Sequence, residues 1–197
     1  MSACSRHSVL IMLALVALAA PATAHADGAS AARARAASER CASADALPGQ
    51  APGDDLREST LCLINAERTA RGLGRLQAEP LLGRVAATYA RLMVRARFFD
   101  HTSPGGSTML ARIRATTYLR DVSSWSVGEN LAWGTGPLAT PRATVRAWMQ
   151  SADHRANLLD RHFADVGIGV VAGAPIALDP GELGGTYVTD FGRRLRG

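Results

Sequence analysis

The sequence contains no lysine: all 22 of its basic residues are arginine. This absence excludes Schiff-base chemistry, a lysine general base and a Walker-type phosphate-binding loop, because each of these needs an ammonium group. Aromatic residues make up only 5% of the chain, which is too few for a nucleic-acid surface built on stacked bases. We therefore expect no nucleic-acid partner, although the net charge is +5. With 197 residues, 47% hydrophobic and 20% charged, the chain is typical of one folded domain with appendages.

Long hydrophobic runs are also missing, apart from one near the N-terminus. Arg6 and His7 precede an apolar run over 9–20, which Pro21 ends and small residues follow. This order predicts a secretory signal peptide over residues 1–26, cleaved at an Ala-x-Ala site. A membrane anchor is the alternative, although the run is about half the length that spans a bilayer. We therefore expect a protein that is secreted or associated with the cell envelope, with no transmembrane anchor after cleavage.

Cysteine is scarce, with three residues in the chain, and Cys4 leaves with the signal peptide. In an exported chain the remaining pair, Cys41 and Cys62, predicts a disulfide. The alternative, a cysteine nucleophile, lacks a partner histidine in either neighbourhood. Residues 27–53 are rich in Ala, Ser, Gly, Pro and Arg with little periodicity. We expect this segment to be a flexible leader that the Cys41–Cys62 bridge pins to the first helix.

The folded domain is expected over residues 54–197, with helices first and strands late. The segments with helical spacing or capping signals begin at Asp54, Pro80, Met109, Thr140 and Ala156. The segments that alternate as strands are 166–171 and 187–191. Residues 120–138 hold three glycines and two tryptophans and are expected to be irregular. This order favours an α+β fold in which helices cover a small antiparallel sheet.

Three histidines remain after signal cleavage, and none lies in a local metal motif such as HExxH. His101 follows the second helix, Glu129 lies in the irregular middle segment, and His154 follows the tryptophan-bearing helix. Spacing alone does not show that they converge, so a structural hydrogen-bonding role for each is the default interpretation. His162 has no motif around it and is expected at the surface, and Ser103, near His101, lacks the context of a nucleophile elbow.

The order of short motifs along the chain is more specific than any single motif. In chain order they are Leu63-Ile64-Asn65-Ala66-Glu67-Arg68, Phe99-Asp100-His101, Gly128-Glu129-Asn130-Leu131-Ala132, His154-Arg155-Ala156-Asn157-Leu158-Leu159, Val166-Gly167-Ile168-Gly169 and Tyr187-Val188-Thr189-Asp190-Phe191-Gly192. Over roughly residues 56–193 this ordered set closely resembles the CAP superfamily (cysteine-rich secretory proteins, antigen 5, pathogenesis-related 1), in its bacterial SCP-like branch. The resemblance implies a three-layer α-β-α sandwich with a small antiparallel sheet between helices.

The resemblance also implies a cleft lined by two histidines and an acidic residue. Mapped by motif, these are His101, Glu129 and His154, and Asn130 beside the acid is a further candidate for ligand binding. A second acid that eukaryotic members carry near the end of the tryptophan helix is missing, because the chain reads Trp148-Met149-Gln150-Ser151 there. Two imidazoles and one carboxylate are a competent set for Zn²⁺ or another divalent ion, so the same three residues are candidate metal ligands.

Two further departures from the family pattern involve acidic residues. Asp153 precedes the second histidine, where the family usually has glycine, and Asp190 stands in the last strand, where glutamine is common. These departures leave a three-member cluster and remove the basis for a four-residue mechanism.

We expect a secreted bacterial CAP-domain protein that acts as a monomer and a non-enzymatic module. It would bind a small-molecule, lipid or cell-envelope ligand in the cleft near His101, Glu129 and His154. The alternative is an extracellular hydrolase, metal-dependent or metal-free, in which the same three residues would supply the catalytic groups. The sequence identifies neither the ligand nor an activated nucleophile.

Overall fold

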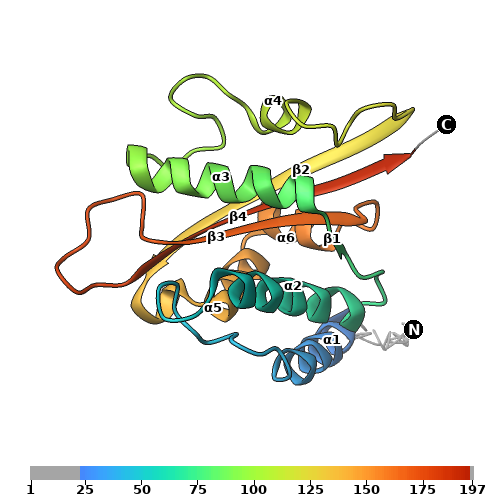
Figure 1. Cartoon of the computed structure of the whole chain (residues 1–197). Coiled ribbons are helices and arrows are strands. Elements are labelled where there is room, and N and C mark those ends of the chain that lie inside the picture. Colours follow the sequence, from blue (N-terminus) through green and yellow to red (C-terminus); the bar gives the residue numbers. More distant parts are fainter. Residues whose placement is uncertain (1–22, 196–197) are drawn as a thin grey trace, which may run out of the picture.

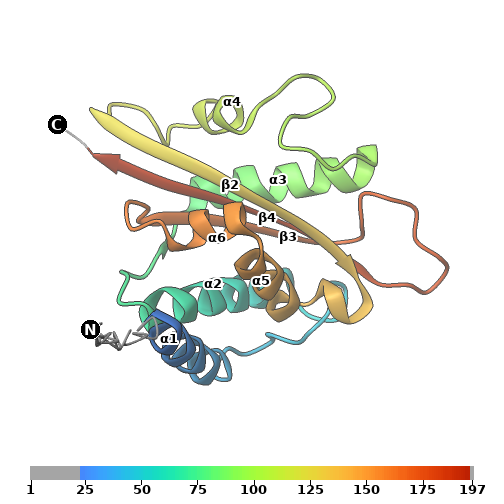
Figure 2. The same cartoon turned by 180° about the vertical axis from the view of Figure 1, so that it is seen from behind.

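The computed structural model describes residues 23–195, with side chains from residue 28 onward. A four-stranded sheet lies between two layers of helices (Figures 1 and 2), which confirms the predicted α+β sandwich. One layer holds α3 and α4, and the other holds α1, α2, α5 and α6. The elements are α1 (Thr23–Ser38), α2 (Gly53–Ala70), β1 (Gln77–Ala78), α3 (Pro80–Ala96), α4 (Met109–Arg114), β2 (Ser124–Thr135), the 3-10 helix η1 (Gly136–Ala139), α5 (Pro141–Gln150), α6 (Ala152–Leu159), β3 (Asp165–Ala172) and β4 (Gly184–Leu195).

The sheet has the strand order β1-β3-β4-β2. β4 pairs antiparallel with β2 on one side and with β3 on the other. β1 adds a short parallel pairing, in which Gln77 lies opposite Asp165 and Ala78 opposite Val166. The sheet is therefore antiparallel, as predicted, except at this edge. The two residues of β1 that form the parallel pairing are too few to show a periodicity in the sequence.

The long strand β2 corrects the expectation that residues 120–138 are irregular. Its odd-numbered residues face α3 and α4, and the acid Glu129 stands in the middle of this otherwise apolar face. The apolar members of the face are Trp125, Val127, Leu131 and Trp133. An acid and several glycines break the alternation that would otherwise have predicted a strand.

Helix α3 packs directly on this face of the sheet. Glu79 caps its N-terminus by accepting a hydrogen bond from the Leu82 amide, and Pro80 occupies the first turn. Gly167 and Gly169 of β3 lie under the helix, where a Cβ at Gly167 would be 2.0 Å from the backbone carbonyl carbon of Leu82. The two glycines therefore set how closely the helix and the sheet approach.

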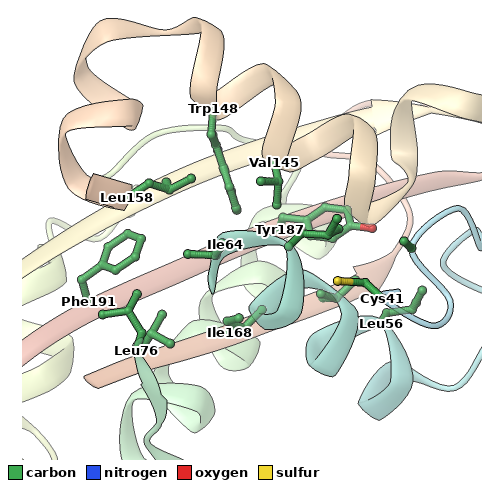
Figure 3. Close-up of a cluster of buried hydrophobic side chains, with 14 of the residues drawn as sticks. Cys41, Leu56, Ile64, Leu76, Val145, Trp148, Leu158, Ile168, Tyr187 and Phe191 are labelled. Atoms are coloured by element: carbon green, nitrogen blue, oxygen red, sulfur yellow. The ribbon is translucent and has the colours of Figure 1, made fainter. Parts of the chain in front are cut away.

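The larger core lies on the opposite face, between the sheet and helices α2, α5 and α6 (Figure 3). Trp148 of α5 is buried in it, and its indole Nε1–H donates to the Leu131 carbonyl of β2. Arg68 of α2 is buried as well and donates to the carbonyls of Leu158 and Asp160, at the end of α6. Trp148 thus fixes α5 against the sheet, and Arg68 fixes the end of α6 against α2.

The N-terminal leader is more ordered than its composition predicts. In place of a flexible segment over the whole of 27–53, helix α1 extends to Ser38 and packs beside α2, with Ala34 buried between them. Alanine and arginine both have high helix propensity, which accounts for a helix that lacks an apolar stripe.

The Cys41–Cys62 disulfide is confirmed, with the two Cα atoms 5.7 Å apart. It joins the segment after α1 to the middle of α2, and closing a loop of this length stabilises a fold by about 3 kcal/mol. The predicted signal peptide, 1–26, lies outside the described residues except for 23–26, so it stays a prediction. Within residues 23–195, no helix combines the length and the hydropathy needed to cross a membrane.

Candidate functional site

Glu129 lies at the centre of β2, on the sheet face that α3 and α4 cover. Its register partner in β4 is Asp190, so the two acidic side chains are neighbours on one face. The preceding residue, Gly128, lies against the Phe163 ring, since a Cβ there would be 3.0 Å from the ring atom Cζ. The Gly-Glu pair is therefore held by packing on one face and by polar contacts on the other.

Both carboxylate oxygens of Glu129 have partners. Oε1 is 2.8 Å from Nδ1 of His101, and Oε2 accepts a hydrogen bond from the guanidinium of Arg112 at 2.6 Å. The Glu129 side chain is only 2% exposed, whereas that of His101 is 58% exposed. The structure thus joins two predicted site residues that are 28 positions apart, with a buried carboxylate beneath an accessible imidazole.

Arg112 is a site residue that sequence reasoning missed. It lies on the short helix α4, and its guanidinium carbon is 3.3 Å from the centre of the Tyr89 ring. It also donates to the His101 carbonyl, so one side chain holds both the histidine backbone and the acid. No local motif marks Arg112; the one available signal is that a buried acid needs a cation.

Asp190 is fully buried beside Glu129. Burial first, and the charge of Glu129 second, raise the pKa of Asp190 well above its ordinary value. Arg112 bonds to Glu129, so the cation stabilises the ionised form of that acid and leaves the neutral form to Asp190. The pair therefore carries one negative charge, which Arg112 balances.

His154 lies on α6 and is positioned through its backbone. Asn130 of β2 donates to the His154 carbonyl at 3.0 Å, and Asn157 donates to the Asn130 side-chain oxygen at 2.9 Å. Asn130 is fully buried with both ends of its amide engaged, so it positions α6 and is not available to a ligand. Burial, followed by the charge of nearby His101, lowers the pKa of His154, which makes this imidazole neutral at pH 7.

The candidate Zn²⁺ site of His101, Glu129 and His154 does not fit this geometry. Among residues 23–195, no group of three or more His, Cys, Asp and Glu side chains is arranged to hold a metal ion. Both oxygens of Glu129 are engaged, and one of the partners is the cationic Arg112, which repels a second positive charge. The contacts of Glu129 are those of a residue that orients His101 and Arg112.

The other two candidates, Ser103 and His162, have local partners of their own. Ser103 accepts a hydrogen bond from the Ser107 amide through its hydroxyl oxygen, which is typical of a turn. His162 is exposed, as predicted, and pairs with Asp160.

A three-layer sandwich with a histidine over a buried acid is the arrangement that the motif order implies. The chain belongs to the cysteine-rich secretory protein (CAP) family, whose model matches residues 61–176. It is 34% identical over 114 residues to the uncharacterized protein YkwD of Bacillus subtilis (strain 168), an alignment that covers 58% of this chain and 42% of that protein. The chain thus spans less than half the length of this relative.

Two solved structures share the fold. An outer surface protein from Borrelia burgdorferi is similar with a TM-score of 0.54 and 24% identity, over 66% of this chain and 86% of that one. An extracellular protein containing a SCP domain, from Bacillus anthracis strain Ames, is similar with a TM-score of 0.53 and 22% identity, over 75% and 44%. At these identities the similarity shows the fold alone, while the match to the family model confirms the resemblance to CAP proteins.

Proposed function

We propose that the protein is an exported, non-enzymatic module that binds a ligand in the cleft of His101, Glu129 and His154. The observation that carries the proposal is the engagement of both Glu129 oxygens, by His101 at 2.8 Å and by Arg112 at 2.6 Å. A buried carboxylate that already bonds an imidazole and a guanidinium orients those groups, whereas activating water calls for an acceptor within reach of it.

The charges around the cleft favour an uncharged, polar ligand. The charges of Glu129 and Arg112 cancel, while the shifted pKa values of Asp190 and His154 favour the neutral form of each. The exposed His101 imidazole then offers hydrogen-bonding capacity to a ligand. Hydroxyl groups of a cell-envelope saccharide, or of a small molecule or lipid headgroup, match this surface.

Aromatic side chains on the same strand support a saccharide among these ligands. Trp125 and Trp133 lie four residues to either side of Glu129 on β2 and are each 39% exposed. Because successive side chains alternate across a strand, both indoles share the face of Glu129. Amphipathic rings that flank a polar centre are suited to a ligand with apolar faces and hydroxylated edges.

Export is part of the proposal. The predicted signal peptide over 1–26 supports it, and so does the Cys41–Cys62 disulfide, since disulfides persist in oxidising compartments. We propose that the leader over 27–53 precedes a CAP domain over 54–197 and that the mature protein acts as a monomer. The extracellular and outer-surface descriptions of the two structural neighbours agree with this location.

A hydrolase that uses the same cleft is the second candidate, and one observation favours it. The Nδ1 atom of His101 bonds to a buried carboxylate, which leaves Nε2 of an exposed imidazole to accept a proton, as in histidine–acid dyads. In that case His101 would be the general base and Glu129 would fix its tautomer.

One pair of variants tests both candidates. Purified mature protein, the double variant His101→Ala/His154→Ala and the control His162→Ala would be screened against wall saccharides, sterols and fatty acids, and assayed on peptides, esters and wall fragments. We expect a ligand that binds the wild type and the control but not the double variant, with equal background turnover in all three. Turnover lost only in the double variant would establish the hydrolase instead. A screen without any retained ligand would refute the binding module.

A further inference from the structure

A concave site lies along the outer edge of β3, between α2 and α3. In Figure 1, β3 runs between these two helices. The floor of this site, which we call the β3 groove, includes Val166, Gly167 and Ile168, and its volume is about 550 Å³. This volume is in the range of sites that hold a small ligand or a few residues of a peptide. None of the lining residues belongs to the histidine cleft.

The backbone at the floor of the β3 groove is open. β1 covers β3 only at Asp165 and Val166, and the Glu79 amide donates to the Val166 carbonyl at the end of this pairing. Backbone groups alternate in direction along a strand, so the N–H and C=O of Ile168 point the same way as those of Val166, into the groove. The chain leaves the edge when α3 begins at Pro80, and no strand within residues 23–195 lies beside Ile168.

The two walls of the β3 groove carry opposite charge. Glu58 of α2 is exposed on one wall, where Asp54 is already paired with Arg57. Arg84 and Arg91 of α3 are exposed on the other wall. Between the walls the lining is apolar, through Leu61, Ala78, Pro80 and Ala87.

We propose that the β3 groove binds an extended peptide segment of a partner protein, which adds a strand to the free edge of β3. Main-chain bonds to Ile168 would supply affinity that does not depend on sequence. Alternate side chains of an added strand point to opposite faces of the sheet, so one set faces α2 and the other faces α3. The complementary partner therefore has acidic side chains on the face toward Arg84 and Arg91, and basic side chains on the face toward Glu58.

This proposal does not depend on the histidine cleft. The probe is a fluorescent, end-blocked octapeptide of alternating glutamate and lysine, and its binding is followed by fluorescence anisotropy. A peptide with the same residues in two blocks has the same net charge and serves as the control. We expect the alternating peptide to bind at least tenfold more tightly than the block peptide, and the His101→Ala/His154→Ala variant to bind it as the wild type does.

Two N-methylated series identify main-chain pairing. In one series every glutamate nitrogen is methylated, and in the other every lysine nitrogen, so that one series blocks the amides that face β3 and the other blocks those that face solvent. We expect one series to lose binding more than tenfold and the other to lose less than threefold. Equal losses in both series, or no binding of the alternating peptide at concentrations on the order of 1 mM, would overturn the proposal.

The protein side supplies an independent readout. Arg84→Glu/Arg91→Glu should abolish binding of the alternating peptide, whereas Arg120→Glu/Arg161→Glu, which changes exposed arginines outside the groove by the same charge, should not. Hydrogen exchange of the Ile168 amide should slow at least tenfold when the peptide is bound. An unchanged exchange rate at Ile168 in the saturated complex would contradict strand addition even if the peptide binds.

Discussion

The two edges of the sheet are closed in different ways. At β2, the outward carbonyls of Glu129 and Leu131 accept hydrogen bonds from the side chains of Asn157 and Trp148. At β3, the two-residue strand β1 covers only the first positions, and the edge from Ile168 onward has no strand beside it within residues 23–195. One edge is therefore bonded by side chains near its centre, and the other is left available to a strand.

At β2, the same hydrogen bonds protect the edge of the sheet and position residues of the candidate site. Asn157, which closes the edge at the Glu129 carbonyl, also bonds to Asn130, and Asn130 holds the backbone of His154. Opening the β2 edge should therefore also displace His154, a residue of the proposed cleft. The β3 edge has no such dependence, so changes there should leave the cleft intact.

The largest expected effect is at Trp148. Trp148→Ala removes a buried aromatic side chain and the donor to the Leu131 carbonyl, and we expect it to lower the free energy of unfolding by about 3–5 kcal/mol. Trp148→Phe keeps most of the packing and should cost about 1–2 kcal/mol. Urea denaturation measures both. If Trp148→Phe were as damaging as Trp148→Ala, the hydrogen bond at the edge would outweigh the packing.

Arg112 comes next, because Arg112→Met leaves the Glu129 carboxylate buried without its cation. We expect a loss of about 3 kcal/mol in the free energy of unfolding. Arg112→Met/Glu129→Gln removes both charges and should recover part of that loss, which a double-mutant cycle in urea would measure. Additive losses in the cycle would show that the two side chains act independently and would remove the basis for an orienting role of Glu129.

Asn157 tests the comparison of the two edges most directly. Asn157→Asp keeps the shape of the side chain but removes the amide donor to Asn130 and to the Glu129 carbonyl, so we expect a loss of about 1–3 kcal/mol. Glu58→Gln, at the exposed wall of the β3 groove, should change stability by less than about 0.5 kcal/mol. Nuclear magnetic resonance of the His154 ring should report a shift for the first variant only. The same shift in both would mean that the edges are coupled.

The sequence predicts the helices other than α1, and the disulfide, because their signals are local. Pro80 in the first turn of α3 and Thr140 at the cap of α5 mark where these helices begin, and the two cysteines that follow the predicted signal peptide leave one pairing. The sequence does not predict β2 because the inward face of this strand carries Glu129. It does not predict β1 because Gln77–Ala78 is too short to show a period. Strand pairing depends on contacts distant in sequence, which periodicity does not record.

The candidate site shows the same difference between features that local sequence predicts and features that depend on contacts distant in sequence. Motif order brings His101 and Glu129 together because both stand in short segments whose sequence is distinctive. Arg112 is 17 residues from Glu129 and is one of many arginines on helix surfaces, so only the fold over α4 shows that it is the cation of the site. Asp190 was singled out as a departure from the family pattern, yet its neutral state depends on burial between strands.

Asp190 lies between the two edges, opposite Glu129 of β2 and Gly167 of β3. Because its pKa is raised in the folded protein, the unfolded chain loses this proton first as pH rises. Stability is therefore lost from the ordinary pKa of an aspartate upward, until the folded pKa is passed. Asp190→Asn cannot ionise, so it should be more stable than the wild type at pH 7, and the difference should shrink toward pH 4. Thermal unfolding between these pH values measures it, with the exposed Asp179→Asn as control. A variant less stable than the wild type at pH 7 would mean that Asp190 is ionised in the fold and that the cleft carries a net negative charge, which would favour a cationic ligand.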